Sequence, residues 1–213
     1  MTQLDVSLTD YGLALECTYF AYRITQLSSP SALRRTFAVF FLSIAIAAAV
    51  GGTVHGFFLD ESSVGFRTLW PLTLIAIGIT ALSGIQIGTA LQFSRSTILL
   101  INRIGLAIFL AYLLTVLFIR RDFLIAILDY LPVLLFLGAA FLRAYRRDKK
   151  QESLIGFFGI CLMLIAAAAQ QARLGIHPLY FNHNALYHLL QAIALAMLFI
   201  AARESIKSGE LIK

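Results

Sequence analysis

Residues 36–58 read TFAVFFLSIAIAAAVGGTVHGFF and contain no Asp, Glu, Lys or Arg. An α-helix needs about 20 mostly apolar residues, each rising about 1.5 Å, to cross the hydrocarbon core of a bilayer. This stretch is long enough, and similar stretches recur along the chain. The sequence therefore predicts a membrane-spanning helix here, with lipid rather than water around much of the surface.

Further apolar runs of about the same length lie on both sides of this stretch. They predict an all-α membrane protein with seven transmembrane helices, near residues 10–27, 36–58, 70–92, 97–119, 122–144, 153–173 and 183–203. Short connections leave no room for a soluble domain, so residues 1–213 are expected to form one bundle. The first ten residues lack the basic and apolar regions of a cleavable signal peptide, so we expect the first helix to direct insertion.

The composition excludes the soluble globular class. The chain is 60% hydrophobic and only 13% charged, with a mean hydropathy of +0.85, whereas soluble domains carry about 25% charged residues. The net charge of +6 is typical of basic cytoplasmic loops beside anionic lipids. We therefore expect membrane lipids as partners and no nucleic acid. Cys17 and Cys161 lie in apolar segments and are expected to be small buried side chains.

Lysine and arginine are distributed unequally between the two sides of the predicted bundle. With the N-terminus outside, twelve basic residues fall on the inner side and four on the outer side. The run FLRAYRRDKKQ at residues 141–151 contributes most of the excess. Because basic loops stay in the cytoplasm, the sequence predicts an outer N-terminus and a cytoplasmic C-terminus.

All four histidines fall at the outer face of this topology. His55 ends the second predicted helix, His183 and His188 begin the seventh, and His177 lies in the loop before it. Further polar residues expected near the same level are Asp10, Glu16, Thr53, Asp60, Gln170, Gln171, Asn184 and Gln191. Polar groups in lipid are costly unless they pair or line a cavity, so this cluster predicts a functional site.

Spacing on the seventh helix leaves two positions open for His183. Asn184, His188 and Gln191 follow an i, i+4, i+7 pattern and share one face. His183 lies about 140° from His188 around an ideal helix. It reaches the same centre if Asn184 caps the helix, whereas a cap at Asn182 turns it toward a neighbour or lipid headgroups.

Three imidazoles with an open fourth position form a common catalytic zinc shell. We expect His55 and His188 to bind zinc, with His183 preferred to His177 as the third ligand and His177 expected to contact headgroups or its own loop. Asp60 has two interpretations: a general base or hydrogen-bond partner of a ligand histidine, or the start of a solvated loop. Glu16 likewise either faces the histidines or pairs within the bundle to stabilise it.

Three motifs carry a resemblance to known proteins. TVHGFF at 53–58, NALYHLLQAIAL at 184–195 and LALECTYFAYR at 13–23 resemble segments of the superfamily that joins alkaline ceramidases with the progestin and adipoQ receptors. The chain resembles an uncharacterised bacterial membrane family more closely still. The superfamily resemblance implies seven helices and a zinc ion held by histidines of helices two and seven. This chain departs from that pattern at Gly51, where serine is usual, and at Asn184, where histidine is usual.

These observations favour a zinc-dependent hydrolase in the inner membrane of a bacterial cell. Its substrate is expected to be a lipid-like ester or amide. Asp60, Gln170 or Gln171 would orient the attacking water, and Thr53 or a glutamine would stabilise the oxyanion. The alternative is a non-catalytic receptor or interaction subunit that uses the same polar pocket. A haem or quinone site ranks lowest, because axial haem ligands normally lie nearer the membrane centre.

Overall fold

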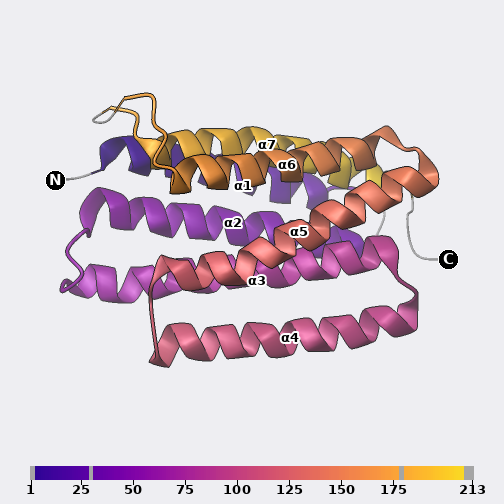
Figure 1. Cartoon of the computed structure of the whole chain (residues 1–213), viewed down its shortest axis with the longest axis horizontal. Helices are drawn as coiled ribbons and strands as arrows, with labels where there is room; N and C mark the ends of the chain where they lie inside the picture. Colours follow the sequence, from indigo (N-terminus) through magenta and orange to yellow (C-terminus); the bar gives the residue numbers. More distant parts are fainter. Residues whose placement is uncertain (1–2, 29–30, 178–179, 209–213) are drawn as a thin grey trace.

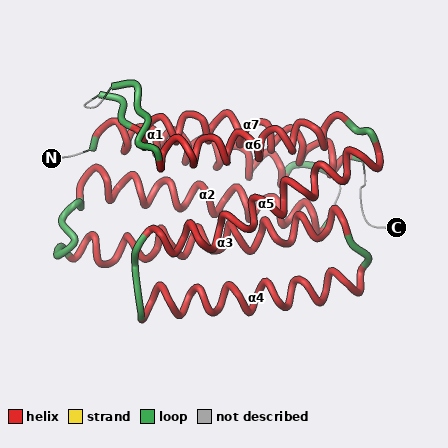
Figure 2. Tube along the Cα trace, viewed as in Figure 1, coloured by secondary structure: helices red, strands yellow, loops and turns green. Residues whose placement is uncertain are grey.

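The computed structural model describes residues 3–28, 31–177 and 180–208, and their regular structure is helical (Figures 1 and 2). Seven helices lie within these described residues: α1 Leu4–Thr25, α2 Ala32–Phe57, α3 Val64–Gln92, α4 Arg95–Phe118, α5 Phe123–Asp148, α6 Gln151–Gln171 and α7 His183–Lys207. The predicted all-α fold and the number of helices are confirmed. Lys213, which belongs to the predicted inner side, lies outside the described residues.

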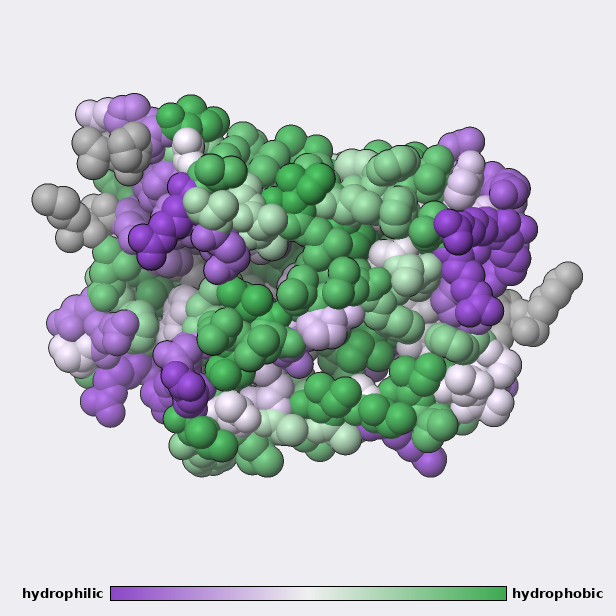
Figure 3. Space-filling model, viewed as in Figure 1, coloured by the Kyte–Doolittle hydropathy of each residue, from purple (hydrophilic) through white to green (hydrophobic). Residues whose placement is uncertain are grey.

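Six of these helices, α2 to α7, are long and apolar enough to cross a membrane. The chain is therefore a multi-pass membrane protein, and the space-filling view shows a hydrophobic middle between two hydrophilic ends (Figure 3). The first helix does not meet this criterion, because Asp5, Asp10, Glu16 and Arg23 lie along it. Its crossing of the membrane remains a prediction, although it packs along α2 and also contacts α7.

Several helices extend beyond the apolar runs that predicted them. The first begins six residues before the predicted start at residue 10, and the third begins at Val64 rather than residue 70. Capping side chains set some of these ends: the hydroxyls of Ser31 and Ser63 accept hydrogen bonds from the backbone of Arg34 and Phe66. A hydropathy count finds the hydrocarbon core, whereas the helices continue into the polar interface.

The helices run back and forth along one common direction (Figure 1). α1 contacts both α2 and α7, α3 lies against α2, and α4 packs mainly on the outside of α3. α5 crosses the bundle obliquely, from the side of α4 at one end to the α5–α6 connection at the other (Figure 1). This crossing lets α5 reach both α3 and α6.

The two ends of the bundle differ in the residues that they carry. What we call the histidine end holds the start of α1 and the α2–α3, α4–α5 and α6–α7 connections, with His55 in the last turn of α2. The opposite end, called the basic end, holds the Arg143–Lys150 segment. Toward the basic end the interior is filled by fully buried side chains, among them Phe37, Phe40, Phe41, Leu137 and Phe141.

Candidate functional site

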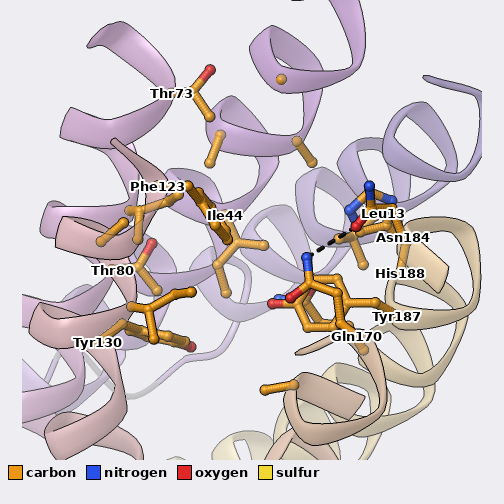
Figure 4. Close-up of a pocket in the computed structure, with 18 of the residues that line it drawn as sticks. Leu13, Ile44, Thr73, Thr80, Phe123, Tyr130, Gln170, Asn184, Tyr187 and His188 are labelled. Carbon is orange, nitrogen blue, oxygen red and sulfur yellow. Dashed lines mark hydrogen bonds between the residues drawn. The ribbon is translucent and has the colours of Figure 1, made fainter. Parts of the chain in front are cut away.

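A cavity of about 360 Å³ lies in the half of the bundle nearer the histidine end. It is lined by residues of α1, α2, α3, α5, α6 and α7, whereas α4 contributes none. Most of its wall is apolar, and Ile44 (Figure 4), Leu134 and Met163 line it further from the histidine end. Asp10, His55, Gln170, Asn184 and His188 line it nearer the histidine end, so the cavity has one polar end and an apolar body.

Asp10 and His188 form the most buried polar contact of this polar end. Nε2 of His188 lies 3.3 Å from Oδ1 of Asp10, and the two side chains are 12% and 7% exposed. Nδ1 of His188 lies 3.1 Å from the hydroxyl oxygen of Thr9. The second carboxylate oxygen of Asp10 is buried and has no hydrogen-bond partner among the described residues. The contact ties α1 to α7 and leaves one acceptor of Asp10 unused.

His55 approaches the same cavity from α2. Its ring stands edge-on to the indole of Trp70, with 6.4 Å between the ring centroids. Its Nδ1 is buried and lacks a hydrogen-bond partner in the described part of the chain. The backbone carbonyl of His55 accepts a hydrogen bond from the amide of Gln3, 3.2 Å away, which fixes the start of α1 against the end of α2.

Amide side chains complete the polar end. The Gln170 side chain donates to Oδ1 of Asn184 over 3.0 Å, and this bond joins the end of α6 to the start of α7 (Figure 4). Gln171 donates to Oε1 of Gln170 over 3.3 Å. Gln191 lies further along α7, is buried and also lines the cavity. These amides supply neutral donors and acceptors rather than charge.

His183 does not line the cavity. Asn182 is the N-cap of α7, and its side chain accepts hydrogen bonds from the amides of Asn184 and Ala185 at 2.8 and 3.2 Å. His183 is therefore the first residue of the helix, which is the arrangement that turns it away from His188. His177 lies in the connection before α7, where its Nδ1 accepts from the amide of Tyr180 over 3.2 Å.

Three other predicted site residues also lie outside the cavity lining. Thr53 donates to the carbonyl of Ala49 over 2.8 Å, and its hydroxyl lies 2.9 Å from that of Tyr11. Asp60 is exposed in the α2–α3 connection. Hydrogen bonds from the hydroxyl and amide of Ser62 hold the pKa of Asp60 below its usual value. Glu16 is half-buried on α1.

Aromatic and hydroxyl side chains that sequence reasoning did not select also line the cavity: Trp70, Thr73, Thr80, Tyr130 and Tyr187. They lie within apolar runs, where an aromatic residue is usual at a membrane interface or in a helix core. Trp70 is the only tryptophan of the chain. Its indole donates to the carbonyl of Arg121 over 2.7 Å, which holds the ring at the cavity.

The three-histidine zinc shell requires His183 to join His55 and His188, and only the latter two line the cavity. In the described ranges, no group of three or more His, Cys, Asp and Glu side chains is placed to hold a metal ion. The positions of the three histidine side chains in the structure therefore do not match the predicted zinc shell. Two imidazoles and one carboxylate nevertheless face a shared space, and they can bind a polar group.

The comparisons with known proteins place this chain in one family. A search of curated proteins found no match, and a search of solved structures found none either. None of the findings connects the chain with the alkaline ceramidases or the progestin and adipoQ receptors. A family model described as "Family of unknown function (DUF6962)" matches residues 6–207. The match covers nearly the whole chain, which therefore belongs to this family of unknown function.

Proposed function

We propose that this protein is a membrane receptor for a single-chain, lipid-like amphiphile. The observation that carries the proposal is the cavity itself: an apolar body set between membrane-spanning helices, with Asp10, His55 and His188 gathered at one end. An amphiphile matches this division, because its chain gains from apolar burial while its headgroup needs polar partners. The bacterial inner membrane is the compartment we propose for it.

We propose that an amphiphile reaches the cavity between α5 and α6. The two helices touch closely near the basic end, where Gly138 faces Ile160 and Gly156 faces Phe141. Toward the histidine end they diverge (Figure 1). Cavity residues there are partly exposed, and Leu131 of α5 is 40% exposed. A ligand chain can therefore enter sideways from the bilayer.

The size of the cavity favours one chain of moderate length. His55 and Ile44 mark its two ends on α2, and at about 1.5 Å per residue they lie about 16 Å apart along the helix. A fully extended ligand chain gains about 3.5 Å in length for every three bonds along it. The cavity therefore holds about 12 to 14 carbon atoms, and the buried phenylalanines beyond it close the deeper end.

Trp70 allows a direct test of binding, because it is the only tryptophan and lines the cavity. We expect dodecanol brominated on its chain a few carbons from the hydroxyl to quench the fluorescence of Trp70, which stands beside His55 at the polar end, in a saturable manner in zwitterionic nanodiscs. Gly51→Leu should weaken this binding by about tenfold or more, because Gly51 lines the cavity and the added side chain occupies it.

Gly12→Leu is the matched control, since Gly12 lies on the outer face of α1 and has no atom within 4 Å of an added Cβ. It should bind as the unaltered protein does. Quenching that rises without saturation, and equally in both variants, would show that the probe reaches Trp70 only from bulk lipid. That result would reject the receptor proposal.

Zinc-dependent hydrolysis of a lipid-like ester or amide is the second candidate. The observation that favours it is the buried Nδ1 of His55, a metal-ligating atom without a partner among the described residues. It shares the cavity with His188 and Asp10.

A further inference from the structure

The described residues that line the cavity include one acidic side chain and no lysine or arginine. Asp10 is the only Asp or Glu among its lining residues, and no Lys or Arg of the described chain lines it. The basic residues of the histidine end, Arg67, Arg120, Arg121 and Arg173, are likewise absent from the lining. The formally charged group that faces a bound ligand is therefore a single carboxylate.

The surroundings of Asp10 do not satisfy that carboxylate. Its side chain is 7% exposed, and the contact of Oδ1 with His188 is long at 3.3 Å. Its Oδ2 is buried without a hydrogen-bond partner among the described residues. On the α2 side it faces Gly52, where a Cβ would stand 2.8 Å from that of Asp10, so no side chain can reach it from there. A buried carboxylate without a cation is costly, and a cationic ligand removes that cost.

The other titratable groups facing this space are His55, Tyr130, Tyr187 and His188. Both nitrogens of His188 already have partners, in Asp10 and Thr9. Tyr130, Tyr187 and Phe123 present aromatic rings to the cavity (Figure 4), and Trp70 also lines it. Aromatic rings attract cations through their faces. The carboxylate and the aromatic rings together favour a positively charged headgroup.

We infer that the headgroup of the ligand is a protonated amine, bound by the free oxygen of Asp10. The inference rests on the proposed binding of an amphiphile and specifies its chemical class: a long-chain amine rather than a fatty acid or a phosphate ester. An anionic headgroup would meet Asp10 as a like charge, with no lysine or arginine in the lining to offset it.

Four brominated twelve-carbon probes test the headgroup on the same Trp70 signal: a primary amine, an alcohol, a carboxylate and a trimethylammonium salt. The amine should bind the unaltered protein about tenfold or more tightly than the alcohol, because a charge-assisted hydrogen bond to a buried carboxylate is stronger than one from a neutral hydroxyl. The carboxylate should bind most weakly. The trimethylammonium salt should fall between amine and alcohol, because it has charge but no N–H donor.

Asp10→Asn should remove the preference for amine over alcohol and leave alcohol binding within about twofold. Glu16→Gln is the matched control, because Glu16 is a half-buried carboxyl on the same helix that does not line the cavity. It should keep the preference. If Asp10→Asn does not fold, the four probes on the unaltered protein still decide the matter.

The outcomes separate this inference from the receptor proposal. Saturable binding in which alcohol or carboxylate equals the amine overturns the inference and leaves the receptor proposal intact. An amine preference that survives in Asp10→Asn also overturns it. Absence of saturable quenching by every probe rejects both.

Discussion

The two cavity histidines differ in what their ring nitrogens contact. His188 is held between Asp10 and Thr9, whereas Nδ1 of His55 is buried without a partner among the described residues. Neutral imidazole tolerates such burial better than a charged group does. His188 therefore serves as a fixed link between α1 and α7, and His55 is the imidazole with a nitrogen to offer a ligand or a metal.

Metal removal distinguishes the two candidate functions. We expect chelation to leave saturable quenching of Trp70 within about twofold, because apolar burial of the chain supplies most of the binding. Loss of binding on chelation, restored by added zinc, would contradict the receptor proposal. The hydrolase reading further requires stoichiometric zinc that disappears in His55→Ala and persists in His177→Ala, the matched change outside the cavity.

At the residue scale, the sequence predicted where polar groups gather but not which of them meet. Asp10, His55, Gln170 and His188 lie on separate helices and line one cavity. His183 does not line the cavity, because α7 starts at the Asn182 cap. In the sequence alone, Asn182 and Asn184 are equally good N-caps. The sequence does not identify Trp70 and Tyr130 as cavity residues, because an aromatic residue in an apolar run has no distinguishing pattern.

At the scale of elements, α1 is the helix that hydropathy describes least well. Its polar residues are accommodated because they face neighbours: the hydroxyl of Ser7 donates to the carbonyl of Gly52 over 2.7 Å, and Asp10 meets His188. The other six helices follow from long apolar runs that contain few charged residues. Their ends were harder to predict, because caps and interface residues set them rather than hydrophobicity.

The α1–α2 contact predicts opposite effects for two neighbouring glycines. An alanine at Gly51 meets Thr73 at an ordinary 3.5 Å, whereas at Gly52 it meets the Cβ of Asp10 at 2.8 Å. Gly51→Ala should raise the free energy of unfolding by about 0.5–1 kcal/mol, since glycine disfavours helix. Gly52→Ala should lower it by about 1–3 kcal/mol through overpacking.

Melting temperatures of the two variants in one detergent provide the measurement. Each variant is the control for the other, because both changes add one methyl group to adjacent positions of α2. Equal melting temperatures would mean that α1 does not pack on α2 as closely as described.

At the scale of the whole molecule, both the cavity and the basic residues divide the bundle into two unlike ends. The polar end of the cavity is nearer the histidine end, while the Arg143–Lys150 segment, at the end of α5, lies at the other (Figure 1). The distribution of lysine and arginine predicts that the histidine end faces outward. The orientation therefore decides from which leaflet an amphiphile reaches the polar residues.

Cysteine labelling in intact cells tests this orientation. Ser62→Cys places a thiol in the exposed α2–α3 connection at the histidine end, and Gln151→Cys places one at the basic end. The native thiols give little background, because Cys17 is buried and Cys161 lies half-buried within α6. A membrane-impermeant maleimide should label Ser62→Cys in intact cells and Gln151→Cys only after the membrane is opened, because twelve of the 17 basic residues are on the predicted inner side.

The reverse labelling pattern would mean that the bundle has the opposite orientation in the membrane, with the amphiphile's headgroup near the cytoplasmic leaflet. Labelling of both sites in intact cells would instead contradict the odd number of crossings between them, because the three helices α3, α4 and α5 separate the two sites.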